Sequence, residues 1–204
     1  MPFDLNPLGY DFGALEPHVP AASLRHHREI VHRAYIDALN RIVSEHPVLN
    51  DRSIEDILRG LDDVPAAVRQ QVAYLGGGHA NHQFLWKVVG PQTHPAPVGD
   101  LAVAIDAAFG SFAAFRDVFE QVAGSLGTEG WCFLSLSRPV SGDLEIVALP
   151  GNGSVLPIAK PGILICDLWD HGTGEAAFPA FWNIVDWTVC DRRLAGLRAG
   201  KAQL

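Results

Sequence analysis

The first half of the chain repeats apolar residues with the period of an α-helix. From Pro20 to about residue 45 there is no glycine, and apolar side chains recur every three or four positions. A proline suits the first turn of a helix, where the missing amide hydrogen costs no bond. We therefore predict a helix over residues 20–45, with His27 facing inward and with His26 and His32 off the apolar stripe, in solvent or at an interface. The predicted stripe is Leu24, His27, Val31, Tyr35, Ala38 and Ile42.

Two further helices are predicted before residue 90. Ser53 precedes Asp56 by three positions, which is a weak capping box and predicts a short helix ending near Leu61. A second helical pattern covers residues 65–89, but three consecutive glycines interrupt it at 76–78. Each glycine costs a helix roughly 1 kcal/mol. Either the helix breaks there, or another element packs too closely for any side chain.

The second half of the chain mixes helical and strand patterns. Pro91, Pro95 and Pro97 indicate a linker and a boundary between two lobes. Helices are expected first, the second of them capped by Ser111, and then strands, of which the Ser141-Gly142-Asp143 turn joins the first two as a hairpin. The expected helices are residues 100–109, 111–126 and 179–194, and the expected strands are residues 131–136, 144–149 and 163–167.

Composition narrows the class of protein. The chain has 204 residues, 48% of them hydrophobic, which is ample for a buried core. A net charge of −8 argues against nucleic acid as the main partner, because phosphate binding needs a basic surface. No apolar run approaches the roughly 20 residues of a membrane span, and the start lacks a signal-peptide pattern. Three widely spaced cysteines argue against a disulfide framework and favour a cytoplasmic location.

The clustered histidines are the first candidates for chemistry. Asp167 and His171 lie four positions apart, directly after an apolar run, so one turn could bring both to one point. A carboxylate with imidazoles suits Mn, Fe or Zn. Taken alone, a turn-capping Asp167 and a surface His171 explain the pattern better than a metal site does.

His27 and His82 extend this candidate set to both halves of the chain. Taken alone, His27 is better explained as a core histidine bonded to a carbonyl. His79 and His82 share a helix face, and one of them should be better aimed. Together the sequence offers three histidines and one carboxylate beside four aromatic residues that suit a dry shell or an ordinary core: Tyr35, Trp86, Trp131 and Trp169.

Ordered motifs along nearly the whole chain resemble the iron/manganese superoxide dismutase family. They begin with Tyr-Asp-Phe-Gly-Ala-Leu-Glu-Pro-His at residues 10–18 and end with Phe-Trp-Asn-Ile-Val-Asp-Trp at residues 181–187. Residues 76–86 are close to the manganese-type pattern. The segment Asp167-Leu168-Trp169-Asp170-His171 matches the family signature Asp-x-Trp-Glu-His with one change.

The resemblance implies a fold and an activity. The fold is α+β, with an N-terminal helical-hairpin lobe over residues 1–90 and a C-terminal α/β lobe with a three-stranded antiparallel sheet over residues 91–204. The implied activity converts superoxide to dioxygen and hydrogen peroxide, as one Mn or Fe ion per chain cycles between its trivalent and divalent states. The implied ligands are His27, His82, Asp167 and His171, together with a water or hydroxide. Tyr35 matches the gateway tyrosine, and Trp131 and Trp169 match aromatic residues lining the site.

The departures from the family lie outside the ligands. Asn152 falls where manganese-type members place a glutamine against the bound solvent, and Gly78 occupies the iron-type alternative, so the pattern leans slightly to Mn. The amide of Asn152 is one methylene shorter than that of glutamine, and a plain turn residue between Gly151 and Gly153 is an equal explanation.

Other departures concern the entrance and the subunit interface. The family's cross-dimer His and Tyr are Val31 and Gly174 here, and its bridging Glu is Asp170. The funnel lysine is Ile30, with Arg28 and Arg33 nearby as substitutes. These changes predict slower dismutation and either a homodimer with an altered interface or a monomer. The alternative function is a metal-binding relative without efficient dismutase activity, serving storage, sensing or partner recognition.

Overall fold

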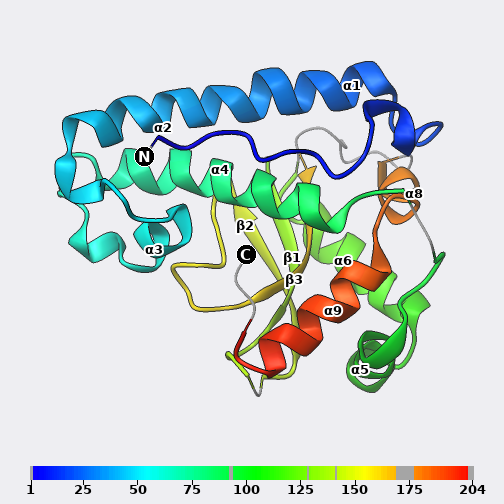
Figure 1. The fold of residues 1–204 in the computed structure, drawn as a ribbon. Coiled ribbons are helices and arrows are strands. Elements are labelled where there is room, and N and C mark those ends of the chain that lie inside the picture. The colour runs from blue at the N-terminus through cyan, green and yellow to red at the C-terminus, as the bar shows by residue number, and fades with distance from the viewer. Residues whose placement is uncertain (1, 92–93, 128, 141, 169–176, 202–204) are drawn as a thin grey trace.

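A long helical hairpin forms the N-terminal part of the molecule. The computed structural model describes residues 2–91, 94–127, 129–140, 142–168 and 177–201. Helix α1 (Ala21–His26), a π-helical segment (His27–His32) and α2 (Arg33–Glu45) run on as one helix. Helix α4 (Arg69–Val88) lies antiparallel beneath them (Figure 1). The fold expected of the first half is confirmed.

The π-helical segment changes which residues face inward. A π turn holds more residues than an α turn, so every later side chain is rotated backward around the helix. Beyond Arg28 the buried positions of this helix are His32, Ile36, Leu39 and Val43, each one residue later than predicted. The prediction that His32 lies off the buried stripe is therefore wrong, whereas His26 is exposed as expected.

Helix α4 continues without a break through its three glycines. A β-carbon on Gly76 would come within 2.8 Å of Ile54, and one on Gly78 within 2.8 Å of the Tyr35 ring. On Gly77 it would overlap the carbonyl oxygen of Asn152. Close packing by three different elements therefore explains the glycines, and the expected alternative of a broken helix is wrong.

The shorter helices begin where their capping residues predict. The Ser53 hydroxyl accepts a hydrogen bond from the amide of Asp56 at the start of α3 (Ile54–Arg59). Ser111 does the same for Ala114 at the start of α6 (Phe112–Gly124), which follows α5 (Gly99–Phe109). Each cap satisfies an amide that the helix itself leaves unbonded.

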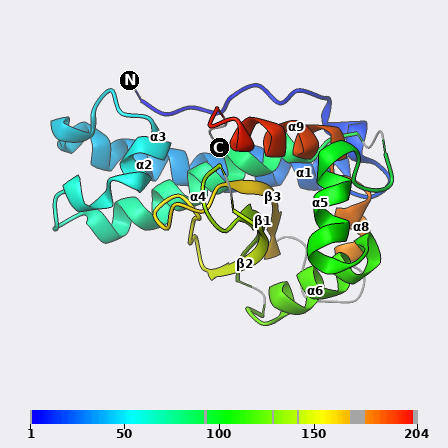
Figure 2. The same cartoon turned by 90° about the horizontal axis from the view of Figure 1, so that it is seen from below.

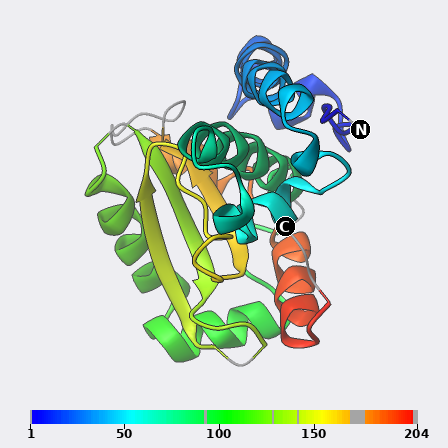
Figure 3. The ribbon, with the colours of Figure 1, turned by 90° about the vertical axis from the view of Figure 1, so that its left-hand side faces the viewer.

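A three-stranded antiparallel sheet forms the C-terminal part, as expected. Its strands are β1 (Gly130–Leu136), β2 (Leu144–Pro150) and β3 (Gly162–Asp167), in the order β2-β1-β3. Figure 3 shows α6 on one side of the sheet, with α4 and α9 (Trp187–Arg198) on the side of β3. Trp131 pairs with Asp167 across β1 and β3, which places the end of β3 beside the buried start of β1.

The closing helix predicted over residues 179–194 is two helices. Helix α8 (Ala177–Trp182) ends before a short stretch in which Val185 pairs with Val89. The Asp186 side chain then caps α9 by accepting a hydrogen bond from the Val189 amide. The single-helix prediction is wrong because this backbone pairing and the new cap divide an apolar pattern that looks continuous.

The N-terminal segment lies along the helical hairpin, as Figures 1 and 2 show for its dark-blue ribbon. Phe3 and the Asn40 side chain exchange two hydrogen bonds of 2.8 and 2.9 Å. Asp4 pairs with Arg33 at 2.6 Å. No helix in the described part of the chain has both the length and the apolar character to cross a bilayer.

Candidate metal centre

Three buried side chains from different elements converge on one point. His27 begins the π-helical segment, His82 lies on α4, and Asp167 ends β3. Nε2 of His27 lies 2.9 Å from Nε2 of His82 and 3.1 Å from Oδ2 of Asp167. Nε2 of His82 lies 3.8 Å from the same carboxylate oxygen. The structure thus brings together three of the four predicted ligands.

The donor set fits a metal ion. Nδ1 of His82 lies 2.6 Å from the Gly78 carbonyl oxygen, which can only accept, so Nδ1 carries the proton. The lone pair on Nε2 of His82 then faces His27 and Asp167. A buried carboxylate needs a compensating partner, and a cation bound by two imidazoles and one carboxylate provides it. The carbonyl bond also fixes the ring, as expected for a metal-ligating histidine.

Aromatic rings enclose the cluster. Trp131 meets His82 edge to face, with ring centroids 4.9 Å apart. Trp86 meets His27 in the same way at 4.9 Å, and Tyr35 lies 5.5 Å from His82. These rings keep water from the nitrogen atoms, which strengthens electrostatic interactions inside the cluster.

Two of the predicted site residues lie outside the described part of the chain. They are His171, the fourth predicted ligand, and Trp169, which was expected to line the site. Asp170 and Gly174, which concern the subunit interface, lie in the same segment. The roles of these residues stay predictions.

Asn152 lies in the loop after β2 and contacts Trp131, one of the rings that enclose the cluster. The residue is buried, and its Oδ1 accepts a hydrogen bond of 3.3 Å from Nε1 of Trp131. This bond fixes the orientation of the amide. Its Nδ2 is buried without a hydrogen-bond partner among the described residues. A donor of this kind is costly unless it bonds to a species that is absent here, such as a metal-bound water.

Tyr35 is a partly buried member of the aromatic shell. Burial, with smaller contributions from Tyr74 and Asp167, raises the pKa of its phenol to about 12. The hydroxyl therefore stays protonated at neutral pH and can donate a hydrogen bond.

A second layer of imidazoles lies behind the ligands, and we name His32, His79 and Trp86 the histidine wall. The indole Nε1 of Trp86 donates to Nδ1 of His32 at 3.1 Å. A neutral His32 then carries its proton on Nε2, which donates to Nδ1 of His79 at 2.9 Å. His32 also stacks on His82 with centroids 4.9 Å apart, so one residue contacts a candidate ligand and holds Trp86.

Both histidines of this wall stay neutral. Burial, with a smaller effect of His82, lowers the pKa of His79 to about 4. Burial and the neighbouring imidazoles also lower the pKa of His32 far below its usual range. A neutral wall suits a cluster that must hold a cation, because it adds no positive charge beside it.

The two arginines proposed as funnel cations serve the N-terminal segment instead. The Arg28 side chain is buried and donates a hydrogen bond to the Asn6 carbonyl oxygen. Burial lowers its pKa. Arg33 forms its ion pair with Asp4. The prediction that they substitute for the family's entrance cations is therefore not supported for Arg28, which solvent hardly reaches.

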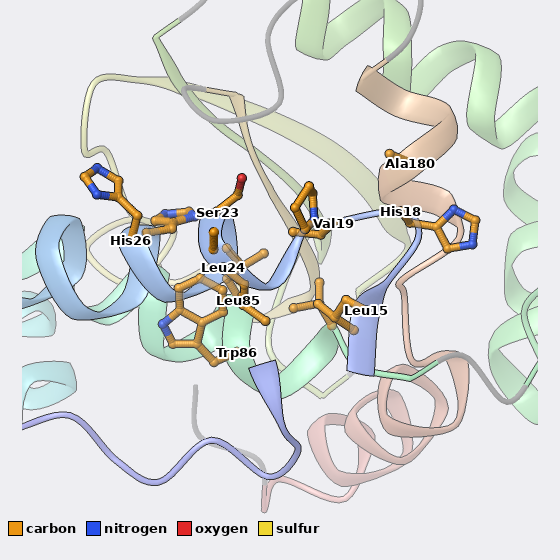
Figure 4. Close-up of a pocket in the computed structure, with 13 residues that line it drawn as sticks. Leu15, His18, Val19, Ser23, Leu24, His26, Leu85, Trp86 and Ala180 are labelled. Atoms are coloured by element: carbon orange, nitrogen blue, oxygen red, sulfur yellow. The ribbon is translucent and has the colours of Figure 1, made fainter. Parts of the chain in front are cut away.

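A cavity of about 640 Å³ opens beside His27 and Trp86. Figure 4 shows His26 and His18 at its two ends, with Leu24, Leu85 and Leu15 between them. Its lining is largely apolar. His27 is the one proposed ligand among the residues that line it.

Sequence reasoning missed three residues of the site. His32 was misplaced because α-helical spacing cannot reveal a π turn. His79 was considered only as an alternative metal ligand to His82. In the structure it instead forms a hydrogen bond with His32, outside the cluster. Tyr74 was not singled out; its position one turn before Gly78 on α4 was the available signal.

Two family models match the chain. The model for iron/manganese superoxide dismutases, alpha-hairpin domain, matches residues 2–90, and the model for their C-terminal domain matches residues 97–193. Members of this family bind one Mn or Fe ion per chain, and the cluster of His27, His82 and Asp167 fits such an ion.

Curated proteins from several bacteria are similar over almost the full chain. A superoxide dismutase (Mn) of Pseudomonas aeruginosa is 35% identical over 202 residues, which cover 96% of this chain and 98% of the relative. A superoxide dismutase (Mn) of Listeria innocua is 34% identical over 200 residues, which cover 95% of this chain and 98% of the relative. Superoxide dismutase (Mn) 1 of Leptolyngbya boryana is 33% identical over 204 residues, which cover 95% of this chain and 81% of the relative.

Proposed function

The chain belongs to the iron/manganese superoxide dismutase family, and from this premise we propose that it converts superoxide to dioxygen and hydrogen peroxide. The observation that carries the proposal is the convergence of the two imidazole nitrogens and the Asp167 carboxylate at a buried point. We propose His27, His82, Asp167 and His171 as the metal ligands. Bound there, Mn or Fe supplies one-electron oxidation and reduction.

The residues around the cluster would serve this chemistry in distinct ways. The unpartnered Nδ2 of Asn152 supports a role for this amide as a donor to solvent in the site. Trp131 holds the amide, and Tyr35 offers a protonated hydroxyl beside it. Both tryptophans of the shell exclude bulk water from the ligand atoms.

The test removes one ligand. In Asp167→Ala, bound Mn and Fe should fall to background and catalysed superoxide decay should disappear, because two neutral imidazoles lose their charged partner. The control is Asp62→Ala, which removes a fully exposed carboxylate. Asp167→Ala with full metal content and unchanged superoxide decay would contradict the proposal.

A second candidate is a metal-binding relative without efficient dismutase activity. It is favoured by the burial of Arg28 and the pairing of Arg33 with Asp4, which leave neither arginine free to draw an anion inward. The metal's optical spectrum discriminates the two. A cycling site should bleach with reductant and recover with oxidant, whereas a storage or zinc site should show neither change.

Three finer expectations belong to this proposal. Gly78 and Asn152 favour Mn over Fe as the bound metal. Val31 supports a homodimer with an altered interface, which sedimentation would test. The three cysteines, Cys132, Cys166 and Cys190, are free and buried, which fits the predicted cytoplasmic location.

A further inference from the structure

One face of α4 holds the loop that follows β2. Gly77 and Asn81 lie four residues apart on this helix and therefore share a face. The backbone of Asn152 packs directly on Gly77, where a β-carbon would overlap its carbonyl oxygen. Nδ2 of Asn81 donates a hydrogen bond of 2.8 Å to the carbonyl oxygen of Gly153. Two successive residues of the loop are thus fixed to α4.

The burial of Asn81 shows what its amide contributes. The residue is fully buried. A carbonyl oxygen can only accept, so Nδ2 of Asn81 must be the atom that faces Gly153. Its Oδ1 is then buried without a hydrogen-bond partner among the described residues, which costs free energy. An apolar side chain would avoid this cost, so the bond to the loop is what the amide adds at this position.

The neighbouring face of the same helix belongs to the cluster. His82 directly follows Asn81 in the chain, and the Gly78 carbonyl oxygen fixes its ring. Trp131 packs its ring on His82 and donates from Nε1 to Oδ1 of Asn152. The helix that carries a proposed metal ligand therefore also sets where the Asn152 amide lies.

We propose that Asn81 is a positioning residue that holds the loop against α4 and so sets the reach of the Asn152 amide toward the metal site. The inference rests on the proposed function, in which this amide donates to solvent in the site. The side chain of Asn152 is one methylene shorter than that of glutamine. A loop held close to α4 by Gly77 and Asn81 compensates for this short side chain.

The test compares Asn81→Ala with the unaltered protein, both loaded with Mn or Fe. Without the bond to Gly153 the loop opens more often. Hydrogen exchange in the peptide of residues 149–156, measured by mass spectrometry, should become about three- to tenfold faster, the worth of one hydrogen bond. The displaced amide of Asn152 also loses its own hydrogen bond in the site, so superoxide decay per bound metal ion should fall about three- to tenfold.

Lengthening the displaced amide should restore the reaction, which a purely structural role of Asn81 does not predict. Asn152→Gln alone adds a methylene to a packed site and should also slow superoxide decay. When Asn81→Ala and Asn152→Gln are combined, the longer side chain spans the wider gap, so decay per bound metal ion should be faster than in either single variant. Asn81→Ser, whose hydroxyl is too short to reach Gly153, should behave like Asn81→Ala while leaving a smaller cavity.

The matched control is Asn40→Ala. It also removes a side-chain amide that holds a segment against a helix, in this case the N-terminal segment at Phe3. Because this segment lies elsewhere on the helical hairpin, neither the exchange of residues 149–156 nor superoxide decay per bound metal ion should change.

The outcomes separate the two proposals. Unchanged exchange of the loop in Asn81→Ala, or a combined variant that is not faster than both single variants, overturns the role of Asn81 and leaves the proposed function standing. An unaltered chain that holds one metal ion and leaves superoxide decay at its uncatalysed rate overturns both.

Discussion

The histidine wall and the loop of residues 151–154 enclose the same cluster but satisfy their polar groups differently. In the wall, Trp86, His32 and His79 form a chain of hydrogen bonds whose direction is fixed by one indole donor. In the loop, Asn152 makes one longer bond to Trp131 and keeps an amide donor without a described partner. The wall supports His82 through the stacked His32, and its chain of hydrogen bonds ends at Nε2 of His79, which has no partner among the described residues. The loop holds its unpartnered donor on Asn152, which Trp131 anchors.

The wall should contribute most to stability, and His32→Phe tests this. Phenylalanine keeps the stacking on His82 but removes the acceptor of Trp86 and the donor to His79. The partly buried Trp86 and the buried His79 lose their partners, so the free energy of unfolding should fall by about 2–4 kcal/mol, as measured by urea denaturation. His94→Phe, at an exposed histidine, should stay within about 0.5 kcal/mol. A loss below about 1 kcal/mol for His32→Phe would contradict a wall held by these bonds.

The position of the loop depends on close contact between the Asn152 backbone and Gly77 of α4, and Gly77→Ala tests this. The added methyl group would overlap the carbonyl oxygen of Asn152 and displace the loop from α4. The free energy of unfolding should fall by about 1–3 kcal/mol, as for other overpacked sites. Gly124→Ala is the matched control, because its methyl group meets nothing within 4 Å, and it should stabilise α6 by about 0.5–1 kcal/mol. Equal effects of the two substitutions would show that the loop does not need this glycine.

Acid should weaken the wall through His79. Its pKa is about 4 in the folded protein and about 6.5 when unfolded, so between these values only the unfolded chain binds the proton. Stability should therefore fall as the pH drops from 6.5 to 4, by up to about 1.4 kcal/mol per pH unit from this residue. Urea unfolding at several pH values should show a shallower slope in His79→Gln. An identical slope in both proteins would mean that His79 is protonated in the fold.

Much of this architecture was predictable from the sequence, because it follows from local patterns. Apolar spacing located the helices and the three strands, and Ser53 and Ser111 marked two helix starts. The convergence of His27, His82 and Asp167 followed from the resemblance rather than from spacing, since each residue alone had an ordinary structural explanation.

What the sequence could not predict depends on nonlocal geometry. The π turn rotates His32 into the interior, and no pattern of residue types in the sequence predicts such a turn. The division between α8 and α9 arises from pairing between Val185 and Val89, which are far apart in the chain. The hydrogen bond that removes Arg28 from the entrance comes from Asn6 in the N-terminal segment, 22 residues away.

The most direct test of the account is the rate of superoxide decay measured against metal occupancy, with the unaltered chain loaded stepwise with Mn or Fe. If the cluster of His27, His82 and Asp167 holds a cycling ion, the catalysed rate should rise linearly with bound metal and level off at one ion per chain. A decay rate that stays at the uncatalysed value when one ion is bound per chain would contradict it.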